Sequence, residues 1–260
     1  MFVLLLVACD TPTDTADTAD TADTGDTADT ADTGDTGDTD TGDTADTGPQ
    51  PFFDEPFDTM DTRRWLPADW KLGDTQFDPF HGRVVDGGLN LVHESDGAGA
   101  WLGAEFYTSD LFRGGMFSAR VFGPKGPGTV CAFFFYGEAD GVVNELDIEL
   151  LDGAAWFSVY RNWTEADGYE ESATHTSTIW PFPDGFDVSA AHEWRMAWGS
   201  ADVRFFVDGD EVATLALVPE GEIAMHINHW TSSTWPEVHG PPTETLMCRF
   251  DGIQAFSLPE

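Results

Sequence analysis

Short runs in which apolar and polar residues alternate fill the chain beyond Pro51. A two-residue period is typical of a β-strand with one buried face, whereas a helix needs a period of about 3.6, which no stretch sustains. We expect strands at 88–92, 115–122, 129–136, 145–151, 156–160, 193–198, 203–207, 222–230 and 248–256. Turns rich in Gly and Asp separate them, at 86–88, 123–128, 152–153 and 208–209. The pattern predicts an all-β fold, a β-jelly-roll sandwich of two antiparallel sheets.

Residues 10–50 have a different composition. From Asp10 to Gly48 they repeat Asp-Thr-Ala and Asp-Thr-Gly triplets, without an aromatic or large aliphatic residue. Such a segment has no apolar surface to bury against the entropy cost of ordering, so we predict a disordered, extended linker. A folded array of calcium-binding nonapeptide repeats is not expected, because those repeats need an apolar position that the triplet lacks. Residues 51–260 are then expected to form one domain.

The chain begins with a short apolar segment that ends at Cys9. It is too short to span a bilayer, which takes about 20 residues, but it fits the hydrophobic part of a secretory signal. Leu-Val-Ala-Cys9 resembles a bacterial lipobox, in which the Cys becomes the lipidated N-terminus, although no basic residue precedes it. The alternative is an apolar N-terminus without function. We predict a lipoprotein-type signal at residues 1–9 and an exported domain that is secreted or held by the lipid at the cell surface or in the periplasm.

Acidic residues outnumber basic ones, 48 to 11, for a formal net charge of -37. A protein that binds nucleic acid needs a face of Lys and Arg for the phosphates, and this chain cannot assemble one. A polybasic membrane-binding surface is disfavoured for the same reason, so the lipid anchor is the only membrane contact that we expect.

Two further cysteines, Cys131 and Cys248, each lie within a strand-like segment. In an exported domain they could form one disulfide, or each could be a separate buried thiol. The sequence leaves both alternatives open, because it does not report the Cα separation that a disulfide requires.

Three acidic residues alternate with aliphatic ones in the segment Glu-Leu-Asp-Ile-Glu, which spans 145–149. In a strand, Glu145, Asp147 and Glu149 point to one face while the residues between them point into the core. Neighbouring acids on that face lie about 6.6 Å apart at Cα. They repel one another, which raises the pKa of at least one of them. The spacing therefore predicts a site where carboxyl groups share a proton.

Two chemistries use such a site. One is the binding of a hard cation such as calcium, which takes oxygen ligands. The other is glycoside hydrolysis, which needs a nucleophile or base and a protonated acid on either side of the scissile bond. On a twisted, concave sheet, the long side chains of Glu145 and Glu149 could converge toward the carboxyl separation of about 5–5.5 Å found in retaining enzymes. The alternative is a solvated acidic face without function.

This segment matches the signature E-[ILV]-D-[IVAF]-E of glycoside hydrolase family 16, the group of laminarinases, lichenases and xyloglucan transferases. Five further regions resemble the family in the same order along the chain. They are 53–65, 104–109 with 113–120, 192–194, 203–209 and 226–230. The resemblance thus covers about 205 residues, and it implies a jelly roll whose concave sheet forms a cleft for a polysaccharide.

The resemblance also implies a role for each acid of the segment. Glu145 would be the nucleophile, Glu149 the general acid/base and Asp147 the residue that orients them and adjusts their pKa. The regular spacing resembles the lichenases and xyloglucan enzymes, whereas laminarinases and agarases usually insert a residue before the last Glu. We therefore expect Glu145 and Glu149 on one regular strand, and no cofactor for catalysis.

Four residues match positions at which the family contacts sugar. Asn228 and Trp230 correspond to the family's M-N-L-W segment, although Trp230 could instead belong to the core. Glu105 matches a substrate-binding acid, and Tyr160 aligns loosely with an aromatic residue of the cleft. The chain departs from the family in two places: Tyr107 stands near where lichenases carry Arg, and Val143 stands where many members have Trp.

Many relatives also carry a structural calcium ion on the convex face. Asp251 and the turn at Gly87 match the usual positions of its ligands, and the alternative is an ordinary turn Asp. The resemblance implies a retaining endo-β-glucanase that acts on β-1,3/1,4-linked polysaccharide, which we expect to be a monomer. The alternatives are a xyloglucan-type transglycosylase and a non-catalytic glycan-binding module on the same fold. Xyloglucan, β-1,3-1,4-glucan, β-1,3-glucan and marine galactans are all compatible with the motif.

Overall fold

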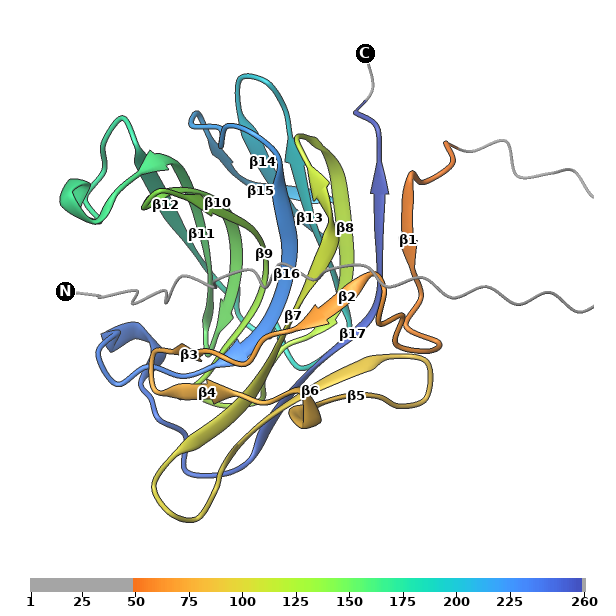
Figure 1. The fold of residues 1–260 in the computed structure, drawn as a ribbon, viewed down its shortest axis with the longest axis vertical. Helices are drawn as coiled ribbons and strands as arrows, with labels where there is room; N and C mark the ends of the chain where they lie inside the picture. Colours follow the sequence, from red (N-terminus) through yellow and green to blue (C-terminus); the bar gives the residue numbers. More distant parts are fainter. Residues whose placement is uncertain (1–48, 259–260) are drawn as a thin grey trace, which may run out of the picture. The chain divides into compact units, whose positions relative to one another are not determined.

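The computed structural model describes residues 49–258 (Figure 1). The predicted signal segment at 1–9 with its lipidated Cys9, and the predicted linker up to Gly48, lie outside the described residues. The described chain is built of strands and three short 3-10 turns. The strands are β1 (Phe53–Glu55), β2 (Trp65–Pro67), β3 (Lys71–Leu72), β4 (Thr75–Phe77), β5 (Gly82–Val84), β6 (Leu89–Ser95), β7 (Trp101–Phe112), β8 (Gly115–Phe122), β9 (Val130–Ala139), β10 (Val142–Leu151), β11 (Ala154–Trp163), β12 (His175–Pro181), β13 (His192–Trp198), β14 (Val203–Val207), β15 (Asp210–Leu215), β16 (Ile223–Trp230) and β17 (Leu246–Phe256). The 3-10 turns are η1 (Pro79–His81), η2 (Glu165–Asp167) and η3 (Pro236–Val238).

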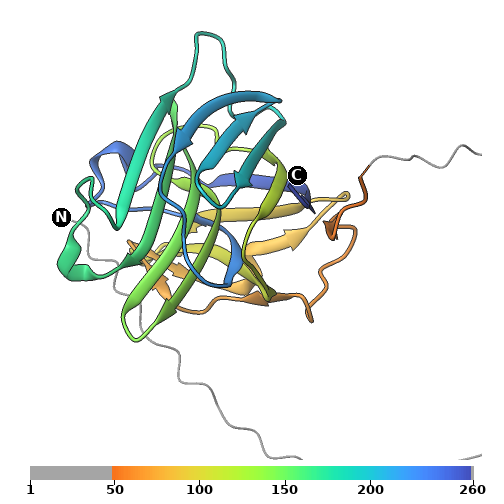
Figure 2. The ribbon, with the colours of Figure 1, turned by 90° about the horizontal axis from the view of Figure 1, so that it is seen from above.

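Most of the strands form two antiparallel sheets, and β3 pairs with β4, which lies parallel to the start of β7. One runs β5-β6-β17-β8-β13-β14-β15, with β1 beside the second half of β17. The other runs β2-β7-β16-β9-β10-β11-β12. Figures 1 and 2 show these sheets as two layers, and the pairing of β6 with β7 joins them at one end. The predicted all-β jelly roll with two antiparallel sheets is confirmed.

The main hydrophobic core lies between the two sheets. It forms because every second residue of the central strands is apolar, as with Leu146 and Ile148 on β10. Aromatic rings contribute much of it: Phe117 and Phe135 have ring centroids 4.5 Å apart, across the two sheets. Full burial of such a side chain contributes about 1.5–3 kcal/mol. The face of β10 opposite to this core is therefore free to carry polar groups.

A disulfide links the sheets. Cys131 on β9 and Cys248 on β17 are bonded across the core, with Cα atoms 6.2 Å apart. Both residues are fully buried. Of the two alternatives that the sequence left open, the structure contains the bridge.

Most strands that the alternation missed are short or lie at an edge, but it also missed β7, a 12-residue strand between β2 and β16. The predicted strands at 115–122 and 203–207 coincide with β8 and β14, and most others are longer than predicted. β12 was not predicted because it pairs only with β11, so both of its faces are partly exposed and its sequence does not alternate. The same holds for β15, which pairs only with β14.

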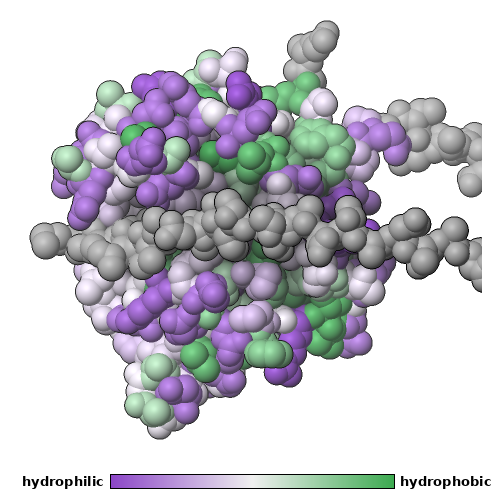
Figure 3. Space-filling model, viewed as in Figure 1, coloured by the Kyte–Doolittle hydropathy of each residue, from purple (hydrophilic) through white to green (hydrophobic). Residues whose placement is uncertain are grey.

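The surface is mainly hydrophilic in the view of Figure 3, with small separate apolar areas. The large apolar side chains that are exposed come from well-separated segments: Phe52, Phe80, Val85, Leu111, Ile179 and Met247. Among the described residues, no helix is long and apolar enough to cross a membrane.

Candidate active site

Three carboxyl groups form a row on β10, in the middle of the second sheet. Glu145, Asp147 and Glu149 point away from the main core, and the aliphatic residues between them point into it. The pairing of β10 with β9 and β11 is unbroken from Glu145 to Leu151, so the prediction of one regular strand is confirmed. A register shift occurs only before Glu145, after Val143. Asp147 is 5% exposed, and the two glutamates are half-buried.

Burial raises the pKa of all three groups, and repulsion from neighbouring carboxylates adds to the rise at Glu145 and Asp147. Burial, with the charges of Glu149 and Glu105, raises the pKa of Glu145 to about 8. Burial alone raises the pKa of Glu149 to about 8. Burial and the charges of both glutamates hold the pKa of Asp147 well above its usual range. Because carboxyl groups this close titrate as a set, at neutral pH the row holds protons that separate carboxyl groups would have lost.

A hydrogen bond decides where one proton lies. The bond between Asp147 and Glu145 lowers the pKa of Glu145 and raises the pKa of Asp147. Within this pair the proton therefore favours Asp147, and Glu145 is favoured as the acceptor. Burial alone acts on the pKa of Glu149, which favours its protonated form. The two glutamates therefore differ in environment, because the bond to Asp147 favours the charged form of Glu145 only.

Aromatic rings of β11 lie beside the glutamates. The register places Tyr160 opposite Glu145 and Trp156 opposite Glu149. Burial, followed by the charge of Glu145, raises the pKa of the Tyr160 hydroxyl well above its usual range. The ring of Tyr160 lies 4.5 Å from that of His175 on β12. Tyr160 therefore lies on the face of the acids, and its contact with sugar stays a prediction.

β9 and β16 supply the other side of this face. Tyr136 lies opposite Glu145, and its hydroxyl donates to Glu138 Oε2 at 2.8 Å. Phe134 lies opposite Asp147 and, on its other side, opposite His226 of β16. The rings of Phe134 and His226 are 4.8 Å apart. Rings therefore flank Glu145 on both sides, Asp147 on the β9 side and Glu149 on the β11 side, and the burial to which they contribute raises the pKa of the acids.

A buried polar cluster lies on the same face of the sheet, on β16 and β7, and β9 separates it from β10. Glu105 of β7 is 3% exposed and accepts hydrogen bonds from His226 Nδ1 at 2.9 Å and from Asn228 Nδ2 at 3.1 Å. The ring of Tyr107 stacks on His226 with centroids 5.2 Å apart. Asn228 is 1% exposed, and its Oδ1 has no hydrogen-bond partner among the described residues. The cluster therefore offers a ligand one unused acceptor, held in place by a carboxylate.

Trp230 lies on the concave side of the sheet but under other residues. It belongs to a second apolar cluster, separate from the main core, and is 7% exposed. Its ring centroid is 6.0 Å from that of Trp235, and the backbone of Gly73 lies against its edge. The side chain lies on the face of the acids and packs as a core residue, and its contact with sugar stays a prediction.

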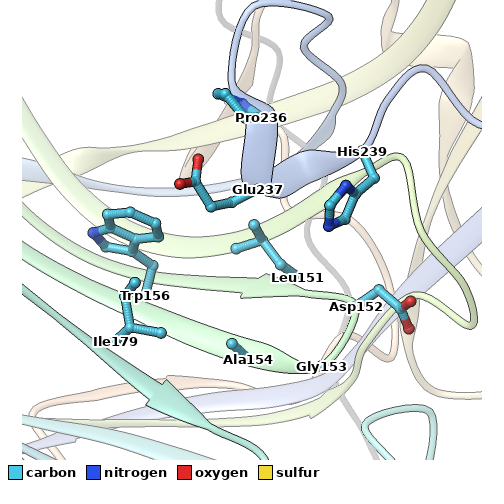
Figure 4. A pocket seen from close by; sticks show the side chains of 9 residues that line it. All are labelled: Leu151, Asp152, Gly153, Ala154, Trp156, Ile179, Pro236, Glu237 and His239. Atoms are coloured by element: carbon cyan, nitrogen blue, oxygen red, sulfur yellow. The ribbon is translucent and has the colours of Figure 1, made fainter.

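A hollow continues the face beyond Glu149, between β10, β11 and η3 (Figure 4). Its volume is about 330 Å³. Trp156 lines one side and Glu237 faces it from η3, with Leu151 between them. The ring of Trp156 also meets Trp235 edge to face, with centroids 5.2 Å apart. The strand that carries the acids therefore ends at an open hollow, which is lined by the ring of Trp156 and by polar side chains such as Glu237.

The family model described as glycosyl hydrolases family 16 matches residues 74–244, which include every group of this site. The chain belongs to glycosyl hydrolases family 16. It is accordingly a glycoside hydrolase, and the matched residues include the row of acids on β10. A curated relative, an endo-1,3-1,4-beta-glycanase ExoK of Rhizobium meliloti (strain 1021), is 27% identical over 193 residues, which are 70% of this chain and 69% of the relative.

Solved structures of family 16 type have the same fold. A Bacillus licheniformis beta-glucanase superposes with a TM-score of 0.70 at 19% identity, over 79% of this chain and 98% of its own. A lichenase derived from a mouse hindgut metagenome has a TM-score of 0.68 at 24% identity, and the match covers 79% of this chain and 99% of the lichenase. The laminarinase catalytic domain of Thermotoga maritima MSB8 has a TM-score of 0.67 at 17% identity, and the match covers 82% of this chain and 99% of that domain.

Several residues of this family 16 site did not stand out from the sequence. His226 lies two residues before Asn228, so the period of a strand already placed both on one face, but only the fold brings Glu105 against them. Trp156 and Trp235 had no motif to mark them. Of the residues expected to bind sugar, Glu105 and Asn228 are hydrogen-bonded to each other. Trp230 lies two residues after Asn228 on β16, and Tyr160 lies on β11, which β9 and β10 separate from β16.

Proposed function

We propose that the chain is a retaining, endo-acting β-glucanase that hydrolyses β-1,3/1,4-linked polysaccharide through a covalent glycosyl-enzyme intermediate. The row of three carboxyl groups on one face of β10 carries this proposal: burial raises the pKa of Glu145 and of Glu149 to about 8, and the bond with Asp147 opposes that rise at Glu145 alone. Retaining hydrolysis needs one carboxylate and one carboxylic acid, and this difference favours Glu145 as the carboxylate.

Each of the three acids then has a role in a two-step reaction. Glu149 donates its proton to the glycosidic oxygen as the C–O bond breaks, and the carboxylate of Glu145 attacks the anomeric carbon to form a glycosyl ester. The freed Glu149 carboxylate takes a proton from a water molecule, whose oxygen attacks the same carbon and releases Glu145. Two inversions give net retention. Asp147 stabilises the Glu145 carboxylate before attack and again when it leaves.

The β-glucan assignment rests on the comparisons and on the walls of the site. The similar proteins are, by name, an endo-1,3-1,4-beta-glycanase, a beta-glucanase, a lichenase and a laminarinase. Tyr136, Trp156 and Tyr160 line the face of the acids, and aromatic faces pack well on the C–H surfaces of pyranose rings. The unpaired Oδ1 of Asn228 supplies an acceptor for a sugar hydroxyl.

We also propose that the enzyme works outside the cytoplasm. The disulfide between Cys131 and Cys248 supports this, because such bonds persist in oxidising compartments. The apolar segment that ends at Cys9 suits export and lipid attachment. Labelling with a radioactive fatty acid, compared between the parent and Cys9→Ser, tests the attachment: loss of label only in the variant is the expected result.

An activity screen tests the function. The full chain is incubated with lichenan, laminarin, xyloglucan and agarose, and new reducing ends are measured; we expect cleavage of at least one β-glucan. NMR of the first product formed should show the β-anomer, as retention requires. Glu145→Gln should remove the activity, whereas Glu244→Gln, an exposed residue away from the site, should not. Transfer to added oligosaccharide in place of water would identify a transglycosylase, and the absence of cleavage on every polymer would refute the proposal.

A further inference from the structure

On the sheet opposite the active site, an arginine lies where the resemblance to family 16 implies a calcium ion. The structure brings together the residues expected for that ion: Asp251 on β17 and the turn at Gly87 between β5 and β6. Between them lies the guanidinium of Arg249, two residues before Asp251 on β17. The oxygen atoms of the expected site all point at this side chain.

Arg249 makes three directed hydrogen bonds there. Its Nη1 donates to the carbonyl oxygen of Val85 at 2.9 Å, and its Nη2 donates to that of Asp86 at 2.9 Å. Its Nε donates to Oδ1 of Asp251. A guanidinium presents donors in a rigid planar fork, so these acceptors hold it in one orientation. One carboxylate and two backbone carbonyls are also what a calcium ion would take as ligands.

The turn is shaped around the arginine. Asp86 and Gly87 both have positive φ, 50° and 68°, which directs the carbonyl groups of the turn toward β17. At the next position, Gly88, a Cβ would lie 2.5 Å from Nη2 of Arg249 and 2.6 Å from Oδ1 of Asp251. Any side chain at that position would displace the guanidinium. The glycine therefore leaves room for this contact.

The residues present do not fit a calcium ion. Calcium takes 6–8 oxygen ligands, and the oxygens available here already accept bonds from a cation. The second oxygen of Asp251, Oδ2, lies 3.8 Å from Nε of Arg120 on β8, so both sides of the carboxylate face positive charge. A divalent ion beside two guanidinium groups would be repelled. Among the described residues, no group of three or more His, Cys, Asp or Glu side chains could hold a metal.

We infer that the guanidinium of Arg249 takes the place of the structural calcium ion and makes the domain independent of calcium. It supplies a positive charge between β17 and the β5–β6 turn, as the ion would, but from within the chain. The inference concerns stability and does not depend on the proposed substrate.

Thermal unfolding of the full-length protein tests this inference directly. We expect the Tm in 5 mM EDTA and in 5 mM CaCl₂ to differ by less than about 1 °C, because a ligand shifts Tm only if it binds the native state. Unfolding of the domain is the right readout, because the many Asp residues before Gly48 could bind calcium weakly without affecting the fold. A rise of about 5 °C or more with calcium would overturn the inference.

Removing the arginine should create the dependence. Arg249→Ala leaves the oxygens of Asp251, Val85 and Asp86 in place, so we expect a lower Tm in EDTA that calcium partly restores. In the double variant with Asp251→Asn this recovery should disappear. Arg120→Ala is the matched control, because it removes a positive charge near Asp251 but leaves the guanidinium of Arg249 and its hydrogen bonds in place. Calcium should not change the Tm of this variant. If Arg249→Ala is insoluble in both buffers, Arg249→Gln replaces it with the same expectation. An equal Tm in EDTA and calcium for the soluble Arg249 variant would contradict the inference.

Discussion

A hydrogen bond joins Asp147 to Glu145, two residues before it on β10. The two side chains meet because a strand returns to the same face every second residue. The bond favours the ionised form of Glu145 on a face where burial favours the neutral form. It therefore sets Glu145, the proposed nucleophile, apart from Glu149, the proposed acid, on which burial alone acts.

Removal of that donor should shift the pH profile of the enzyme in one direction. In Asp147→Ala, Glu145 loses the bond that lowers its pKa, so the acidic limb of kcat/KM should move to higher pH. We expect kcat to fall about 100-fold. Asp147→Asn keeps a donor and should retain more activity, with a smaller shift of the limb. Profiles measured between pH 4 and 9 on one β-glucan check this. An unchanged acidic limb in Asp147→Ala would show that the bond does not control Glu145.

Azide can assign the two glutamates separately. With an aryl β-glycoside, whose leaving group needs no acid, Glu145→Ala should be rescued by azide to give an α-glycosyl azide, because azide attacks in place of the missing nucleophile. In Glu149→Ala the glycosyl ester still forms, so azide should give the β-azide. NMR of the products distinguishes the two. The opposite pairing of variant and anomer would exchange the roles of Glu145 and Glu149.

The sequence was sufficient to predict the row of acids because its evidence is local. Alternation placed Glu145, Asp147 and Glu149 on one face, and the strand proved regular. The contact of Glu105 with His226 joins two residues 121 positions apart in the sequence, and the alternation within either strand does not predict it. The covering of Trp230 by Trp235 and Gly73 likewise depends on loop packing.

The convex face shows the limit of a motif more sharply. Asp251 and the turn at Gly87 match the family positions, and they do lie together. Arg249 changes the meaning of the match, because its side chain already binds their oxygen atoms. If Arg249 replaces the ion as we infer, a ligand motif interpreted without the neighbouring cations predicts an ion site that a side chain of the protein fills.

The buried acids should lower the stability of the protein at neutral pH. Burial raises the pKa of Glu149 to about 8, so its native state favours the proton. The resulting stability is present below about pH 4.5 and is lost as the pH rises through about 8. Glu149→Gln removes this loss. Its Tm should exceed that of the parent by about 2–5 °C at pH 8 and by nothing at pH 4. Thermal melts at both pH values, with Glu244→Gln as the exposed control, measure the difference. A gain of equal size at pH 4 would point to packing instead of charge.

Two buried histidines should make the domain sensitive to acid. Burial lowers the pKa of His93 to about 3 and that of His229 to about 4. Nε2 of His93 lies 3.0 Å from the hydroxyl oxygen of Thr75, which also accepts the backbone N–H of Thr231, and burial disfavours a second proton on the ring. A lowered pKa gives stability that is complete above about pH 6.5 and is lost as the pH falls toward 4. We therefore expect the Tm to drop less between pH 6.5 and 4.5 in His93→Gln than in the parent. The exposed His239→Gln should behave like the parent. Parallel Tm curves for parent and His93→Gln would mean that this histidine does not contribute to acid unfolding.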